Sequence, residues 1–317
     1  MRRRRFLSTA ARTAAGVAAG AAGASFLPVR ALAGGLSADD VRLVILHTND
    51  THSRIDPFAV GSGRNEGQGG AARRATLINQ VRSQNPHVLL LDSGDIFQGT
   101  PYFNLFGGEV EMKVMSEMGY DVATIGNHDF DNGTDGLVAM LPHANFEFVC
   151  ANYDITHSGL ASRVRPYTIR ELGGVKVGIF GLGIDFYALV VDDLHQGVSY
   201  SDPIGAARRV SEELRNQGCD LVICLSHLGY RYSTDRPSDT DLANLVPEVD
   251  LILGGHTHTF MDSPDVYRAG ETGLTVVNQV GFAGIRLGRI DVTFQESGVI
   301  ASAESRHYKI DERYDLV

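Results

Sequence analysis

Two histidines, His256 and His258, lie two residues apart and follow a pair of glycines and the apolar run 251–253. An apolar run that stops at two glycines predicts a buried strand that leads into a tight loop. Two neutral imidazoles that face the same point are a common way to bind a transition metal. This stretch is therefore the first candidate for a metal-binding loop.

Four further apolar runs also end in residues that can bind a metal. These residues are Asp50 and His52 after 41–46, Asp95 after 88–91, Asn127 and His128 after 121–125, and His227 after 221–225. Each of them alone has an ordinary interpretation, such as a strand-end cap, a turn residue, a solvated loop or a buried core histidine. In open α/β sheets, however, sites gather at the carboxyl ends of the strands. We therefore expect these side chains to lie together.

The candidate ligands are too many for one tetrahedral zinc ion, which takes about four. They are Asp50, His52, Asp95, Asn127, His227, His256 and His258. Such a set suits two metal ions about 3.5–4 Å apart that share one carboxylate. Mixed oxygen and nitrogen donors predict zinc, manganese or iron, and the lack of cysteine in the set argues against a thiolate site.

Charge indicates which reaction such a site would serve. Two divalent cations outweigh the two aspartates, so the site keeps a net positive charge and attracts anions. Paired metal ions also lower the pKa of a bound water and polarise a phosphoryl oxygen. The reaction class that uses both effects is in-line displacement at phosphorus.

Strands and helices alternate along the chain after residue 40. We expect strands at 41–46, 88–91, 121–125, 146–150, 175–181, 221–225, 250–253, 274–278, 285–294 and 299–309, and helices at 71–84, about 104–118, 133–141 and 203–217. This order predicts an α/β protein in which helices cover sheets. Because no long linker interrupts it, we expect one catalytic domain over 41–310.

Composition excludes several classes of partner. The net charge is −10, which argues against binding a nucleic acid duplex. No apolar run of about 18 residues follows the N-terminus, so no membrane span is expected. The three cysteines, Cys150, Cys219 and Cys224, predict buried thiols rather than a disulfide framework. A pairing of Cys150 stays open.

Residues 1–33 have the pattern of a targeting segment. Basic residues and an Ala/Gly-rich stretch precede Ala31-Leu32-Ala33, which matches a signal cleavage site. The start Arg3-Arg4-Arg5-Phe6-Leu7 resembles a twin-arginine signal. We therefore expect a periplasmic or secreted protein, exported by the twin-arginine route. An ordinary secretory signal and a basic tail are the alternatives.

Four motifs resemble those of the calcineurin-like metallophosphoesterases, and most closely the N-terminal catalytic domain of the 5′-nucleotidase family. The resemblance extends over about residues 41–295 and includes the lone His227. The motifs are His47-Thr48-Asn49-Asp50-Thr51-His52, Gly94-Asp95-Ile96-Phe97-Gln98-Gly99, Gly126-Asn127-His128-Asp129-Phe130-Asp131 and Gly254-Gly255-His256-Thr257-His258.

The resemblance implies a four-layer α/β/β/α sandwich with two metal ions at the sheet ends. One ion would be held by Asp50, His52, Asp95 and His258, and the other by Asn127, His227 and His256, with Asp95 bridging. The resemblance further implies that a metal-bound water or hydroxide attacks the phosphorus. His128, oriented by Asp131, would stabilise the transition state or donate a proton to the leaving group.

The sequence departs from the family pattern at two points. His258 stands where many 5′-nucleotidases have glutamine, and the chain ends at Val317, before the C-terminal domain that binds the nucleobase in bilobal members. We expect a phosphoesterase that acts on phosphate monoesters, with 5′-nucleotides favoured. The alternatives are a thiohydrolase of the sulfur-oxidation type and a catalytic subunit that needs a separate substrate-binding chain. Phe186 and Tyr187 would either contact substrate or cover a core edge.

Overall fold

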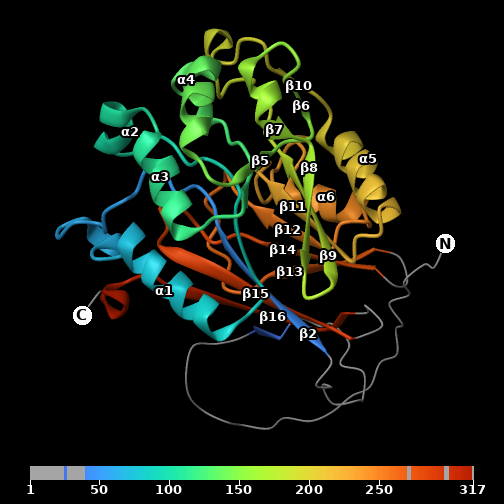
Figure 1. Ribbon diagram of the computed structural model, residues 1–317. Coiled ribbons are helices and arrows are strands. Elements are labelled where there is room, and N and C mark those ends of the chain that lie inside the picture. Colours follow the sequence, from blue (N-terminus) through green and yellow to red (C-terminus); the bar gives the residue numbers. More distant parts are fainter. Residues whose placement is uncertain (1–24, 27–39, 270–272, 296–299, 316–317) are drawn as a thin grey trace.

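Two β-sheets packed face to face form the centre of the molecule (Figure 1). The computed structural model describes residues 25–26, 40–269, 273–295 and 300–315. Apart from the two-residue strand β1 (Ser25–Phe26), the segment 1–33 that carries the export prediction lies outside the described residues. The metal-site prediction falls entirely within them.

The first sheet has the strand order β1-β16-β15-β2-β3-β4-β5-β7. Its strands β2, β3, β4, β5 and β7 run parallel, whereas β15 is antiparallel to both β2 and β16. The bounds are β2 (Val41–Thr48), β3 (Val88–Asp92), β4 (Val122–Ala123), β5 (Glu147–Val149), β7 (Val164–Arg165), β15 (Arg286–Phe294) and β16 (Ile300–Lys309).

The second sheet has the strand order β13-β14-β12-β11-β9-β8. Its four inner strands are parallel, and the edge strands β8 and β13 are antiparallel to their neighbours. The bounds are β8 (Tyr167–Leu172), β9 (Val175–Leu182), β11 (Leu221–Ser226), β12 (Leu251–Gly254), β13 (Asp265–Ala269) and β14 (Gly273–Asn278). A separate pair joins β6 (Tyr153–Asp154) to β10 (Ser199–Tyr200).

Helices cover the outer face of each sheet, as the coloured ribbons of Figure 1 show. The first sheet is covered by α1 (Ala71–Gln84), α2 (Pro101–Phe106), α3 (Glu109–Met118) and α4 (Gly133–Met140), and the second by α5 (Pro203–Asn216) and α6 (Asp239–Leu245). Single 3-10 turns are η1 (Gly63–Asn65), η2 (His128–Phe130), η3 (Leu141–His143), η4 (Gly159–Ser162), η5 (Asp192–Leu194) and η6 (Glu312–Tyr314).

Three apolar cores separate the four layers. Along β2, Leu43 and Ile45 pack between the two sheets, while Val44 and Leu46 pack against the helices of the first sheet. This division follows from the two-residue period of a strand, whose neighbouring side chains point to opposite faces. The third core lies between the second sheet and helices α5 and α6. The predicted four-layer α/β/β/α sandwich is therefore confirmed.

The prediction of a single helix over about 104–118 is wrong. The chain forms α2 and α3 instead, because Gly107 and Gly108 adopt φ of 65° and 110° and interrupt the helical backbone. A Cβ at Gly108 would also collide with the Phe97 ring. The strand expected over 121–125 is shorter, at Val122–Ala123, and the sequence pattern did not reveal β8, β13 or α6.

The cysteines are free thiols, and all three are buried. The Sγ of Cys150 lies 3.6 Å from the Asn152 Oδ1 and donates to it. Burial raises the pKa of the Cys150 thiol to about 11, so the thiol stays protonated at neutral pH. Within the described part of the chain, no helix is both long enough and apolar enough to cross a bilayer.

Candidate metal centre

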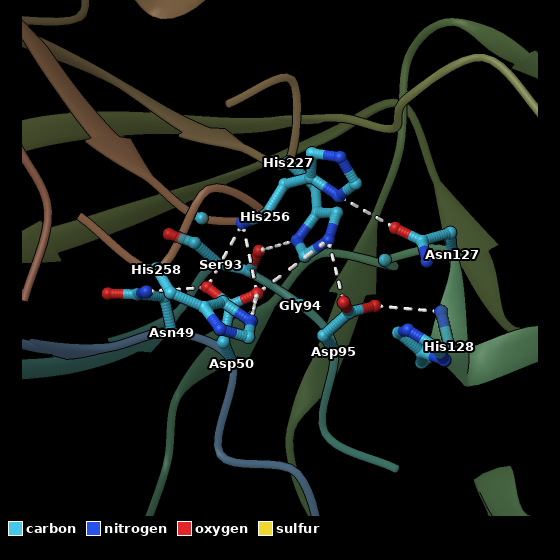
Figure 2. Close-up of polar contacts among 12 residues, drawn as sticks. Asn49, Asp50, Ser93, Gly94, Asp95, Asn127, His128, His227, His256 and His258 are labelled. Atoms are coloured by element: carbon cyan, nitrogen blue, oxygen red, sulfur yellow. Dashed lines mark hydrogen bonds and ion pairs between the residues drawn. The ribbon is translucent and has the colours of Figure 1, made fainter. Parts of the chain in front are cut away.

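Five loops meet where β2, β3 and β4 of the first sheet and β11 and β12 of the second sheet end (Figure 2). Parallel strands end at the same edge of a sheet, and the two sheets present these edges to one another. The structure therefore brings together all the residues that the sequence singled out as ligands. Figure 2 shows the side chains of Asp50, Asp95, His227, His256 and His258 directed toward a common space.

The backbone at this place is strained. Positive φ angles are adopted by Asp50 (50°), His52 (48°), Asp95 (55°), His256 (67°) and His258 (52°). For a residue with a Cβ such a conformation costs about 1 kcal/mol or more, and it persists only where the surroundings enforce it. Strain of this kind clusters at functional sites.

The first cluster consists of Asp50, His52 and His258. The Nε2 of His258 lies 3.3 Å from the Asp50 Oδ1, and the Nε2 of His52 lies 4.0 Å from the same oxygen. The Nδ1 of His52 lies 3.2 Å from the Phe97 carbonyl oxygen. Because a carbonyl only accepts, Nδ1 carries the proton, and the neutral ring of His52 presents a lone pair at Nε2.

The second cluster consists of Asp95, His227 and His256. The Nδ1 of His227 donates to the Ser93 carbonyl at 2.6 Å, which leaves Nε2 facing the Asp95 Oδ2 at 3.1 Å. Asn127 joins this cluster through its Oδ1, which lies 2.9 Å from the Nδ1 of His256. The carboxylate of Asp95 also reaches the first cluster, since its Oδ2 is 3.9 Å from the Nε2 of His52.

These residues fit a pair of cations. Asp50 and Asp95 are 0% and 1% exposed, and among the described residues their only ion-pair partners are histidines. Among the described residues, the partners of the buried Nε2 of His227 are the carboxylates of Asp95 and Asp50. Buried carboxylates are normally paired with cations or coordinate metals, and the donors here are imidazole nitrogens and carboxylate or amide oxygens, which suit zinc, manganese or iron.

Protonation states differ sharply within the metal-free site. Burial lowers the pKa of His227, but the charges of Asp95 and Asp50 outweigh it and raise that pKa to about 10. For Asp95, burial raises the pKa, and the positive charge of His227 outweighs this and lowers the pKa below its usual range. Burial lowers the pKa of His256 to about 4. In the metal-free site, the protonated ring of His227 therefore supplies the positive charge that a metal ion would otherwise supply.

Metal binding should release this proton. Below about pH 10 the metal competes with the proton on His227, so we expect about one proton released from this residue and an affinity that rises about tenfold per pH unit. Calorimetric titration of zinc in two buffers with different protonation enthalpies measures the number released. The variant His227→Asn should release one proton fewer, and equal release by both proteins would contradict this assignment.

His128 lies beside the clusters but belongs to neither. Its backbone N–H donates to the Asp95 Oδ1 at 2.8 Å, and its ring meets the His52 ring edge-on at 5.4 Å. The Nδ1 of His128 lies 3.0 Å from the Asp131 Oδ2. The hydrogen bond to Asp131 is the main cause of a raised pKa at His128. Because the side chain is 37% exposed, an incoming substrate can reach it.

Asp129 organises the loop that carries Asp95, a role that the sequence did not reveal. Its carboxylate accepts four backbone N–H bonds, from Asp95, Ile96, Phe97 and Gly126, at 2.8–3.1 Å. It thereby ties the Asp95 loop to the loop of Asn127. The only available signal was its place inside the motif 126–131.

Two amides hold the remaining loops. Asn49 donates to the Asp50 Oδ2 and to the Gly281 carbonyl, both at 2.5 Å. Gln279 donates to the Gly255 carbonyl at 2.6 Å and accepts from the Thr257 hydroxyl at 3.1 Å. These bonds fix the His256–His258 loop against β14. Nothing in the sequence pattern pointed to Gln279.

Gly255, the residue before His256, lies so close to neighbouring atoms that no side chain fits there. A Cβ at Gly255 would lie 2.8 Å from the Ser93 carbonyl oxygen and 2.9 Å from the Nδ1 of His227. Real Cβ atoms essentially never come so close to other heavy atoms. The loop can therefore pass between β3 and His227 only without a side chain at this position.

Comparison with known proteins places this site in a family. The calcineurin-like phosphoesterase profile matches residues 43–260, which contain all the candidate ligands. The snake venom 5′-nucleotidase of Gloydius brevicauda is 34% identical over 283 residues, which are 83% of this chain and 47% of that protein. The 5′-nucleotidase of Bos taurus is 32% identical over 283 residues, covering 82% and 48%.

A solved structure agrees with these sequences. The 5′-nucleotidase precursor from Thermus thermophilus aligns with a TM-score of 0.78 at 31% identity, covering 86% of this chain and 55% of that one. The chain thus spans about half the length of the relatives it matches. It belongs to the calcineurin-like phosphoesterase family, as a metal-dependent hydrolase similar to the N-terminal domain of the 5′-nucleotidases.

Proposed function

We propose that this protein hydrolyses phosphate monoesters and that 5′-nucleotides are its favoured substrates. The observation that carries the proposal is the meeting of two three-residue clusters, Asp50/His52/His258 and Asp95/His227/His256, beside His128, whose imidazole belongs to neither cluster. The relatives named 5′-nucleotidase support the nucleotide class.

The first cluster would hold one metal ion, and the second cluster with Asn127 would hold the other, while Asp95 serves both. When bound, a pair of divalent ions supplies a positive field that lowers the pKa of water and polarises phosphoryl oxygens. The two carboxylates and the imidazoles are held in place before any substrate arrives, because Asp129, Asn49 and Gln279 fix their loops. Such preorganisation avoids reorganisation cost during the reaction.

His128 would supply the proton that the leaving alkoxide needs. The carboxylate of Asp131 holds Nδ1 at 3.0 Å, so the ring keeps a fixed orientation and its Nε2 can donate. The raised pKa of His128 keeps the ring protonated at and somewhat above its ordinary pKa. His128 would also stabilise negative charge on the bridging oxygen by hydrogen bonding.

We further propose that the protein acts after export, in the periplasm or as a secreted enzyme. The support is the basic start Arg3-Arg4-Arg5-Phe6-Leu7 and the Ala31-Leu32-Ala33 site. Expression with Arg3 and Arg4 replaced by lysine, followed by cell fractionation, tests this. Retention of the variant in the cytoplasm is expected, and normal export would contradict the twin-arginine route.

The function is tested by metal analysis followed by a phosphate-release panel. The panel contains 5′-AMP, 3′-AMP, 4-nitrophenyl phosphate, a cyclic nucleotide, a nucleotide sugar and a thiosulfonate, with zinc-, manganese- and iron-loaded protein. We expect turnover of 5′-AMP that a chelator abolishes and added metal restores. Sulfate release from the thiosulfonate alone would favour the thiohydrolase alternative, and activity only after adding a co-purified chain would favour a separate substrate-binding subunit.

A further inference from the structure

Arg236 occupies the loop between β11 and α6, which begins at the second-cluster residue His227. Its guanidinium donates to the Tyr187 carbonyl at 3.4 Å and lies 5.6 Å from the centre of the Tyr232 ring. Arg236 therefore lies on the segment that directly follows a second-cluster histidine, and it packs against Tyr232 of the same segment.

The loop that carries Arg236 is attached to the site on both sides. The hydroxyl of Tyr232 donates to the carbonyl of Leu228, the residue after His227, at 2.7 Å. The backbone N–H of Tyr230 donates at 3.0 Å to the hydroxyl of Thr257, which lies between His256 and His258. Gly229, with φ of 96°, leaves room for the Tyr232 hydroxyl, with which a Cβ would collide. Arg236 thus has a defined position relative to both histidine loops.

The partner on the other side, Tyr187, is also held firmly. The preceding residue, Phe186, is buried and packs on the Phe130 ring at 5.0 Å and on the His195 ring at 4.3 Å. Phe130 belongs to the motif that carries His128. The sequence left open whether Phe186 and Tyr187 contact substrate or cover a core edge. In the structure Phe186 covers the core, whereas Tyr187 is 80% exposed.

The charge of Arg236 is not compensated by an acid. Within residues 40–269, 273–295 and 300–315, no carboxylate lies within ion-pair distance of its guanidinium, whereas Arg215 is paired with Asp250 and Arg286 with Asp262. Its contacts with the Tyr187 carbonyl and with Tyr232 still leave N–H donors of the guanidinium free for a ligand. An unpaired guanidinium beside a site for anions matches the planar, bidentate geometry of a phosphate.

We propose that Arg236 binds a phosphate of the substrate at the edge of the metal centre. The proposal rests on the phosphoesterase function and adds a specificity residue to it. The phosphate is either the group that is transferred or a second phosphate of the same substrate. Arg236 would act by binding rather than by moving a proton, since guanidinium stays protonated.

The variant Arg236→Gln tests this, with Arg231→Gln as the matched control. Arg231 lies in the same loop, but it is exposed and its guanidinium covers the Tyr230 ring and donates to the Tyr267 hydroxyl. The measurements are calorimetric binding of inorganic phosphate to metal-loaded protein and the KM and kcat for a nucleoside monophosphate and a nucleoside diphosphate.

For Arg236→Gln we expect affinity losses of about tenfold or more, kcat within about threefold, and partial recovery in Arg236→Lys. Losses with inorganic phosphate and the monophosphate assign the contact to the transferred group, and a loss confined to the diphosphate assigns it to the second phosphate. Equal behaviour of Arg236→Gln, Arg231→Gln and the unmodified protein overturns the proposal, as does loss of metal from Arg236→Gln. Phosphate binding decides the matter even if no ester is hydrolysed.

Discussion

Replacing Asp95 by asparagine should lower kcat/KM for phosphate esters by at least about 10³-fold, the largest effect expected from one substitution. The carboxylate of Asp95 reaches both clusters, with its Oδ2 3.1 Å from the Nε2 of His227 and 3.9 Å from that of His52. The Oδ1 of Asp50 is farther from the other cluster, at 4.0 Å from the Nε2 of His227. Asparagine removes one of the two carboxylates that belong to the clusters and offers a single oxygen. Within the clusters, only Asp50 would then oppose the repulsion between two cations.

Metal content separates this explanation from misfolding. We expect mass spectrometry of Asp95→Asn to show loss of at least one metal ion per chain, with an unchanged circular dichroism spectrum. Asp121→Asn is a suitable control, because Asp121 accepts a backbone bond from Leu90 in the same sheet without facing either cluster. Two tightly bound ions in Asp95→Asn would show that Asp95 is not shared.

Replacing His128 by asparagine should lower kcat for a nucleoside monophosphate by about 10²–10⁴-fold while both metal ions remain bound. The reason is that His128 belongs to neither cluster and, in the proposed mechanism, donates a proton from a ring held by Asp131. The loss should be smaller with 4-nitrophenyl phosphate, whose leaving group departs without a proton. An unchanged kcat for both esters would exclude His128 from the reaction.

The pH profile gives an independent test of the same pair. Hydrogen bonding to Asp131 raises the pKa of His128, so the donating, protonated form persists to higher pH and kcat falls as pH rises through that pKa. Replacing Asp131 by asparagine removes this effect. The alkaline limb of kcat should therefore move to lower pH in Asp131→Asn, and it should be absent from His128→Asn. If the alkaline limb of Asp131→Asn stayed at the same pH, the limb would arise from the titration of a group other than His128.

The meeting of the candidate ligands could be predicted from local sequence because strand ends and ligand types are both local properties. Apolar runs identified the strands that end before Asp50, Asp95, His227 and His256, and parallel strands necessarily end at a common edge. The broken helix at Gly107 and Gly108 was missed because apolar spacing does not register a backbone turn that two glycines permit. The short edge strands were missed because exposed edges need no regular apolar pattern.

By itself, the sequence determined the class of fold, the residue types of a candidate two-metal site and the five loops that carry them, since these depend on period, composition and order along the chain. Only the tertiary structure decided which side chains face one another. It revealed the four N–H bonds to Asp129, the contacts of Gln279 with the His256–His258 loop, and the packing of Arg236 on Tyr232 without an acidic partner. Most of those contacts join residues far apart in the chain, so their distances and charges exist only once both sheets have packed.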